Sequence, residues 1–475
     1  MTAPPVSGAS AGAWSKWGTP GILFLLALAL RIYRLNQSFW YDEIYAVVIG
    51  FHAPWIEMVT RMPNANHHPL YALLAKPCLL LLGEKEWTVR LPSLIFGSLT
   101  PPLLYRLGAR WMNPRVGLLA SLIMAVAMWP VCYSQDARGY AAMIFFSLLA
   151  TDQFLVLTDQ PSRGGTAIYV LSAIAAGYAH LYSLALVAAH LAAGLILAFR
   201  REKRAVGLRL AALSLAALAG AALVYAPMIS GFIRFAVTRG QGLASASPAF
   251  PGFVAQMFLS WTAGEAHPWL SLLVLAPAAA GLGWTFSRQR TLALIWLISV
   301  FLGVAIPALT RTFIFARYLS YAVPGLYLFC AAGLDRAAER LKPRSGFVAL
   351  LAAPTLLVLS MGLANYYHLG KQALRPAAEW IKQRAPTARV LTVGRISDVF
   401  RYYYPQAQEL QEGTLLASSL LRHTVVVISY PSQIEERDLA ILNWNCRQPV
   451  SLPSAVEPDC EVRIYLCDGA FLPEH

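Results

Sequence analysis

The sequence predicts an all-α, multi-pass membrane protein that ends in a small α/β domain. Of its 475 residues, 57% are hydrophobic and 13% are charged, whereas soluble globular proteins carry about 25% charged residues. Apolar runs of membrane-spanning length recur as far as residue 363. Strand-like runs that alternate with helical segments replace them in the tail. We therefore predict a membrane domain over residues 1–363 and an α/β domain over residues 364–475.

The apolar runs predict about eleven transmembrane helices, because a spanning helix needs about 20 predominantly apolar residues. The run 166–199 is too long for one helix, so we divide it near Ala179 and His180. The first span ends in two arginines without a small-residue cleavage site, so we interpret it as a retained helix. The predicted spans are residues 19–35, 90–108, 116–134, 139–157, 166–179, 182–199, 208–228, 269–286, 291–309, 319–335 and 346–363.

The loops between these spans indicate their orientation. The arginine-rich loops Arg106–Arg115, Arg200–Arg209, Arg288–Arg290 and Asp335–Arg344 all fall on one side. Cytoplasmic loops carry an excess of Lys and Arg, so this side is predicted to be cytoplasmic. The net charge of +14 is thereby explained by topology and contact with membrane lipid, and nucleic acid is excluded as a partner. The tail falls on the opposite, extracytoplasmic side.

One apolar run is too short to be a span. Pro69–Leu82 has about 14 residues, and counting it as a span would invert the side of every later loop. We expect a helix that lies at the outer membrane interface.

The tail is predicted to contain strands at Ala388–Val393, His423–Ser429 and Glu461–Cys467, and a helix over Pro376–Arg384. It contains no glycine-rich phosphate loop, which favours a lid or a recognition module over a reaction centre. Three of the six cysteines lie in this tail, and an oxidising location would permit a disulfide between Cys446 and Cys460.

The first extracytoplasmic loop carries the acidic pair Asp42 and Glu43 directly after Tyr41. Charged groups beside a membrane are costly to place without a role. A carboxylate there can accept a proton from an attacking hydroxyl, and Asp42 is the better candidate base. The structural alternative is a solvated start of the loop.

The same loop ends in two histidines, His67 and His68, before Pro69. Adjacent histidines can bind phosphate or a metal, or they can cap a helix whose first turn holds the proline. A third ligand of the usual zinc type is missing, so a tight zinc site is not expected. A divalent cation shared with Asp42 or Glu43 remains open.

Two further clusters face the same side. Asp136 and Arg138 lie between predicted spans, where Asp136 can support an acceptor and Arg138 can hold an anion, or the two can pair with each other. Arg317, followed by Tyr318, lies at the outer end of a span. Its guanidinium suits a lipid phosphate, although an arginine there can also simply reach the headgroup region.

These motifs together resemble the glycosyltransferase family 39 group, which includes protein O-mannosyltransferases and aminoarabinose transferases with the GT-C fold. The matching segments cover roughly the first 340 residues in family order. They are RIYRLNQSFWYDEIY, HHPLYALLAK, EWTVRLPSLIFGSLTPPLLYRLGARW, YSQDARGYAAM and ARYLSYAVPGLYLFCAAGL.

The resemblance implies an enzyme of the bacterial inner membrane that moves a sugar from a polyprenyl-phosphate donor to a lipid, glycan or protein acceptor. It implies a catalytic role for Asp42, with Glu43 and Asp136 as further acidic residues of the site. Arg138, Arg317, Tyr318, His67 and His68 would contact the donor phosphate. The expected reaction is a single displacement with inversion at the anomeric carbon.

Two other functions fit the same features. A transporter or flippase of lipid-linked saccharide would also place polar groups at the membrane surface, although transporters are expected to carry ionisable residues near mid-membrane. A membrane scaffold with a degenerate transferase fold is the third hypothesis, and the full set of polar motifs argues against it.

Overall fold

The computed structural model describes residues 13–62, 67–231, 233–234, 250–262, 264, 267–310, 314–339, 341–410 and 423–467. The chain divides into two compact units. The first unit contains residues Met1–Tyr33, Pro54–Ala75 and Arg90–Gly362. The second contains Arg34–Ala53, Lys76–Val89 and Leu363–His475. The second unit therefore combines the predicted α/β tail with most of the loop that carries Asp42 and Glu43, which the sequence analysis assigned to the membrane domain.

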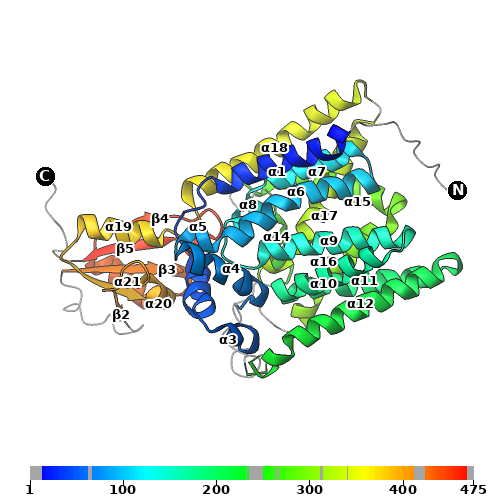
Figure 1. Ribbon diagram of the computed structural model, residues 1–475. Coiled ribbons are helices and arrows are strands. Elements are labelled where there is room, and N and C mark those ends of the chain that lie inside the picture. Colours follow the sequence, from blue (N-terminus) through cyan, green and yellow to red (C-terminus); the bar gives the residue numbers. More distant parts are fainter. Residues whose placement is uncertain are drawn as a thin grey trace. The chain divides into compact units, whose positions relative to one another are not determined.

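The first unit consists of long helices that run alongside one another (Figure 1). Helices α4 and α18 begin in this unit and end in the second one. Its helices are α1 (Ala13–Ile32), α3 (Trp55–Thr60), α4 (Pro69–Leu82), α6 (Leu91–Trp111), α7 (Pro114–Val126), α8 (Met128–Ser134), α9 (Tyr140–Asp159), α10 (Arg163–Ala179), α11 (Leu184–Ala198), α12 (Arg204–Tyr225), α14 (Phe250–Ser260), α15 (Leu272–Arg288), α16 (Arg290–Thr310), α17 (Val323–Ala337) and α18 (Arg344–Leu369), with 3₁₀ segments η2 (Leu181–Ser183), η3 (Arg201–Lys203), η4 (Ala226–Met228), η6 (Pro268–Ser271) and η7 (Ala316–Ala322).

Each of the eleven predicted spans coincides with a helix or a pair of helices. Within the part of the chain that the structure describes, six helices are long and apolar enough to cross a membrane, or seven if α7 and α8 form one span. This confirms a multi-pass membrane protein, while the count of eleven remains a prediction. The run Pro69–Leu82 forms the separate short helix α4.

The bend between α7 and α8 positions the residues that follow α8. The two helices meet at 61°, which leaves the last carbonyls of α7 without partners in the helix. The buried side chain of Arg31, at the end of α1, donates to the carbonyls of Met124 and Ala125 at 3.2 and 3.3 Å. In return, the Gln135 amide donates to the Arg31 carbonyl at 2.7 Å. These bonds fix the residues that follow α8.

At the helix ends next to the arginine-rich loops, two carboxylates form ion pairs that hold neighbouring helices together. Asp152 of α9 lies 3.2 Å from Arg110 of α6. Asp335 of α17 lies 3.0 Å from Arg115 and 2.6 Å from Arg344. Asp335 thus joins two of the arginine-rich loops, which agrees with their predicted placement on one side of the membrane.

Helices α15 and α17 approach closely because glycines face each other across the contact. A Cβ atom on Gly281 would overlap the Phe329 carbonyl, and one on Gly333 would overlap the Pro277 carbonyl. Small residues at such crossings let helix backbones pack tightly in membranes.

The second unit is built on a five-stranded sheet with the strand order β2-β1-β3-β5-β4. β1 pairs in parallel with β2 and β3, whereas β5 is antiparallel to β3 and β4. The three predicted strands are confirmed as β1, β3 and β5, and the predicted helix as α19. The elements of this unit are α2 (Tyr41–Tyr45), η1 (Ala46–Phe51), α5 (Glu86–Val89), α19 (Leu374–Arg384), β1 (Arg389–Val393), η8 (Gly394–Ile396), α20 (Ser397–Phe400), β2 (Gln408–Leu410), β3 (Thr424–Ser429), η10 (Pro431–Gln433), α21 (Glu436–Asn445), β4 (Val450–Leu452), η11 (Pro458–Cys460) and β5 (Val462–Cys467).

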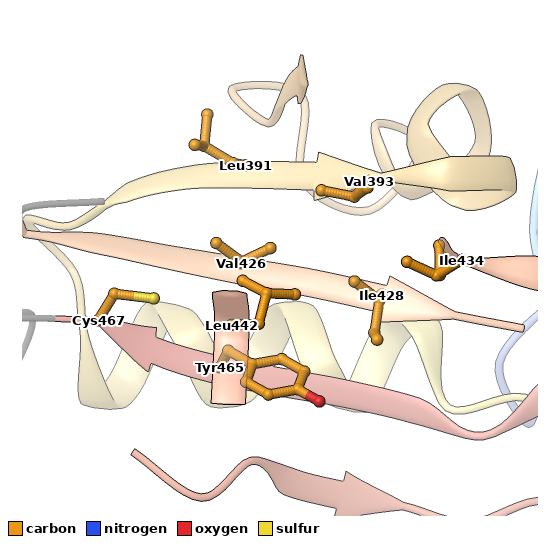
Figure 2. Packing of buried hydrophobic residues seen from close by; sticks show 8 residues of the cluster. All are labelled: Leu391, Val393, Val426, Ile428, Ile434, Leu442, Tyr465 and Cys467. Atoms are coloured by element: carbon orange, nitrogen blue, oxygen red, sulfur yellow. The ribbon is translucent and has the colours of Figure 1, made fainter. Parts of the chain in front are cut away.

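The core of the sheet follows from its alternating sequence. Successive strand residues point to opposite faces, so Val426 and Ile428 of β3 share a face with Tyr465 of β5 (Figure 2). Leu442 of α21 packs against this cluster. All six residues of β3 are buried, which matches the continuous apolar run expected of a central strand.

The predicted Cys446–Cys460 disulfide is wrong. Cys446 is bonded to Cys467, because β5 brings its last residue beside the end of α21. Cys460 is buried and forms no disulfide, and its Sγ lies 3.5 Å from the Tyr430 hydroxyl. Cysteine spacing could not choose between these partners, since the choice depends on the strand register.

Candidate active site

The predicted site residues are distributed over both units. In the first unit, four segments meet at the helix ends opposite the arginine-rich loops: the start of α4, the residues between α8 and α9, the turn after α10, and η7. They carry His67 and His68, Asp136 and Arg138, His180, and Arg317 with Tyr318.

The partners of His68 fix its protonation state. Its Nδ1 lies 2.9 Å from the Ala179 carbonyl, which only accepts hydrogen bonds. Its Nε2 lies 2.6 Å from Nη2 of Arg138, which only donates. Nδ1 must therefore carry the proton, and Nε2 accepts from the guanidinium. Burial, together with the nearby charge of Arg138, holds the pKa of His68 well below its usual range, so the ring is neutral.

His67 points elsewhere. Its Nε2 lies 2.8 Å from the Met58 carbonyl and donates to it. Burial lowers the pKa of His67, and the charge of Arg138 adds to this effect. Pro69 occupies the first position of α4, as the capping alternative expects. The histidine side chains themselves bond to other segments and do not cap the helix.

The loop that carries Asp136 and Arg138 is buried and tightly held. Both side chains are almost completely buried. The Ser93 hydroxyl of α6 lies 2.6 Å from the Asp136 carbonyl and 3.1 Å from the Arg138 carbonyl. Gly139 permits the close approach of α10, because a Cβ there would overlap the Ala179 carbonyl. The loop geometry thus places the Arg138 guanidinium beside His68 and 5.6 Å from the ring centre of Tyr140.

His180 connects Arg138 and Arg317. Its ring centroid lies 5.1 Å from that of His68 and 4.9 Å from that of Tyr318. Burial lowers the pKa of His180 to about 3, and the charges of Arg138 and Arg317 both contribute. Two guanidinium groups therefore act on one neutral imidazole. No spacing in the sequence singled out His180, because its neighbours come from three other segments.

Arg317 is 5% exposed, and its guanidinium lies 3.7 Å from the ring centre of Phe315. It is thus a buried cation on aromatic faces, and not an arginine extended towards headgroups. Tyr318 stacks near Tyr182, with ring centroids 4.9 Å apart. The site of the first unit is consequently a set of neutral histidines and aromatic rings around two cations. Such a site is suited to an anion.

The acidic pair lies in the second unit, on α2. Asp42 and Glu43 are both buried there. A Glu43 carboxylate oxygen accepts from the Trp40 backbone N–H at 3.3 Å, which is the reciprocal half of a capping box. This hydrogen bond gives Glu43 a structural role at the start of the helix. The alternative of a solvated loop start does not fit, because neither carboxylate is exposed.

The histidine pair does not fit a metal site. Both nitrogens of His68 and one nitrogen of His67 are engaged by protein groups. Throughout the described ranges, no three His, Cys, Asp or Glu side chains come together closely enough to hold an ion. The Arg138 guanidinium lies 2.6 Å from Nε2 of His68, so an ion could reach this nitrogen only by displacing Arg138.

Fold and site together define a multi-pass membrane protein with two buried arginines and neutral histidines at one end of its helices. Comparison with known proteins specifies this class further. Residues 66–230, about a third of the chain, match the family model described as dolichyl-phosphate-mannose-protein mannosyltransferase. The comparison with curated protein sequences found no match.

Solved structures show the same fold. ArnT from Cupriavidus metallidurans bound to undecaprenyl phosphate aligns over 98% of this chain and 100% of its own, with a TM-score of 0.57 and 14% identity. The archaeal oligosaccharyltransferase AglB from Archaeoglobus fulgidus, in complex with an inhibitory peptide and a dolichol-phosphate, aligns over 93% of this chain and 73% of its own, with a TM-score of 0.52 and 12% identity. The fold is therefore of the GT-C type, and the predicted resemblance to glycosyltransferase family 39 is confirmed over the matched segment.

Proposed function

We propose that the protein is a membrane glycosyltransferase that moves a sugar from a polyprenyl-phosphate donor to an acceptor hydroxyl or phosphate on the extracytoplasmic face. The observation that carries this proposal is the pair of buried guanidinium groups around His180. Guanidinium groups suit phosphate oxygens in both charge and geometry. The leaving group of such a donor, a lipid monophosphate, is an anion of this kind.

The fold comparison supports the same class of ligand. ArnT was solved with undecaprenyl phosphate and AglB with a dolichol-phosphate. Both are lipid monophosphates, and this chain carries the cations such a ligand requires. The arginine-rich loops lie at the opposite ends of the helices, which supports an extracytoplasmic site if those loops are cytoplasmic.

The reaction is a single displacement with inversion. The acceptor oxygen attacks the anomeric carbon, and the bond from that carbon to the phosphate oxygen breaks. The bonding electrons stay on the phosphate, and the acceptor proton passes to Asp42. Arg138 and Arg317 stabilise the charge that develops on the departing phosphate, which is usually the larger contribution. Asp136 supports the acceptor side.

His68 has a positioning role in this scheme. As a neutral acceptor it holds Nη2 of Arg138 and leaves the positive charge of the guanidinium intact. A protonated histidine would repel the guanidinium and lose this bond. The lowered pKa of His68 is therefore a requirement for orienting Arg138.

The test is transfer from a panel of radiolabelled polyprenyl-phosphate sugars by purified protein in liposomes that contain membrane extract. Labelled product from at least one donor is expected, and its sugar defines the donor. Movement of labelled lipid across the bilayer without a glycosidic product would instead establish the flippase function. Neither product nor movement, with intact donors and folded protein, would contradict both functions.

A further inference from the structure

Helix α2 continues directly into η1, and the two together form only a short helical segment. They have five and six residues, whereas isolated helices shorter than about 12–15 residues are marginal in water. The first backbone N–H groups of any helix lack partners within it. The orientation of Asp42, the second residue of α2, must therefore come from groups outside the helix.

Side chains of the tail supply these partners. The Tyr403 hydroxyl accepts from the Phe39 backbone N–H at 2.8 Å. The Gln372 side-chain oxygen accepts from the Tyr41 N–H at 2.8 Å. Tyr403 and Gln372 lie more than 300 positions further along the sequence than the residues whose N–H groups they bind.

Gln372 is itself fixed by the sheet. Its amide nitrogen donates to the Ser429 hydroxyl at 2.9 Å, and Ser429 is the last residue of the central strand β3. The side chain of Gln372 is 2% exposed. Because the Tyr41 N–H can only donate, the oxygen of the amide must face α2 and the nitrogen must face β3. One buried amide thus connects the most buried strand of the sheet to the residue before Asp42.

Neighbouring residues reinforce this connection. The Arg375 backbone N–H donates to the Ser38 hydroxyl at 3.0 Å, and its guanidinium donates to the Asn36 carbonyl at 2.6 Å. The Lys371 ammonium lies 5.3 Å from the ring centre of Trp40. Lys371, which precedes α19, and Arg375, in its first turn, therefore contact residues 36, 38 and 40, which precede α2.

We propose that the C-terminal α/β domain is part of the catalytic unit and that Gln372 is the positioning residue that sets the orientation of Asp42. This inference rests on the proposed function, in which Asp42 accepts the acceptor proton. It replaces the expectation that the tail is a lid or a recognition module. The domain acts as a fixed frame, because Gln372 and Ser429 are buried and hydrogen-bonded to each other.

The test compares Gln372→Met with Gln372→Glu in the full-length protein. Methionine has a similar length but neither bond, so the Tyr41 N–H loses its partner. We expect kcat to fall about 10- to 100-fold, since a displacement of about 1 Å can cost that much, while KM for the donor stays within about twofold. Glutamate keeps an oxygen towards Tyr41, and the Ser429 hydroxyl can turn to donate to the other oxygen. Gln372→Glu should therefore recover most of the lost kcat.

Hydrogen exchange over residues 38–45 provides a readout that does not depend on activity. Gln372→Met should accelerate it, and Gln383→Met, the same change at an exposed position of α19, should alter neither exchange nor kcat. Unchanged exchange in Gln372→Met, or accelerated exchange with wild-type kcat, would overturn the positioning role while the proposed function stands. Absence of transfer by the wild-type protein would overturn both, and exchange alone would then report how α2 is held.

Discussion

The two units place buried charged groups in different ways. In the first unit, Arg138 is oriented by His68 and by a buried loop, and the contacts join segments that are 70 and 111 residues apart. In the second unit, the helix of Asp42 is oriented by a residue 331 positions away. The cation site depends on helix ends that pack together, whereas the acidic site depends on a hydrogen bond to the central strand of a sheet through Gln372. Substitutions in the two regions should therefore change different measured quantities.

The largest effect is expected from Asp42→Asn. Asparagine keeps the shape but cannot accept the proton, so kcat should fall about 100- to 10 000-fold. Binding of a polyprenyl phosphate should remain, because the cations lie in the first unit. Transfer assays and lipid-phosphate binding measure the two quantities. Glu43→Gln is the matched control and should cost less, and near-normal turnover of Asp42→Asn would remove this residue from the mechanism.

Unlike Asp42→Asn, Arg138→Gln should impair the binding of polyprenyl phosphate as well as turnover. Loss of one preorganised cation should lower kcat/KM about 100- to 1000-fold and weaken polyprenyl-phosphate binding as well. Arg138→Lys should recover little, since an ammonium lacks the fork geometry of the guanidinium. Arg209→Gln, an exposed arginine near the other helix ends, serves as the control. Unchanged lipid-phosphate affinity in Arg138→Gln would contradict the assignment of the anion site.

The Cys446–Cys467 disulfide should matter only to the second unit. It closes a loop with a sequence separation of 21 residues, and a loop of this length contributes about 3 kcal/mol in the chain-entropy description. Cys446→Ser should therefore accelerate hydrogen exchange in β3 and β5 and leave α9 and α10 unchanged. Cys460→Ser is the control. A non-reduced peptide map that links Cys446 to Cys460 would refute this pairing.

The histidine cluster should make the first unit sensitive to acid. The folded pKa of His180 is about 3, below the unfolded value of about 6.5, so between these values the unfolded chain binds more protons. Stability should fall as the pH drops from about 6.5, by about 1.4 kcal/mol per pH unit for this residue. Thermal unfolding against pH measures it. His180→Asn should flatten the profile, whereas His267→Asn, at an exposed position, should not; equal slopes would contradict the buried neutral state.

The smallest effect is expected from chelation. EDTA should leave transfer within about twofold of its normal rate, because the Ala179 carbonyl and Arg138 engage both nitrogens of His68 and leave none available for an ion. Activity lost to EDTA and restored by a divalent cation would show that other residues hold a metal. His68→Gln should be measured in the same assay, since the glutamine side chain can still accept a hydrogen bond from Arg138.

The sequence by itself determined the membrane class, the long apolar helices and three of the five strands, because hydrophobic length and alternation are local properties of the chain. It also predicted that Asp136, Arg138 and Arg317 lie at the same ends of the helices, since successive helix ends alternate between two faces. These inferences needed no knowledge of which elements touch.

The tertiary structure alone decided the partners. Strand register selected Cys467 over Cys460 as the partner of Cys446, and packing at the end of α10 brought His180 between two arginines. It also gave His68 the partners that keep it neutral, and it assigned the loop of Asp42 to the unit that contains the tail. Hydrogen bonds and buried charges depend on distance in space, and residues such as Tyr41 and Gln372 share no sequence pattern that reveals their contact.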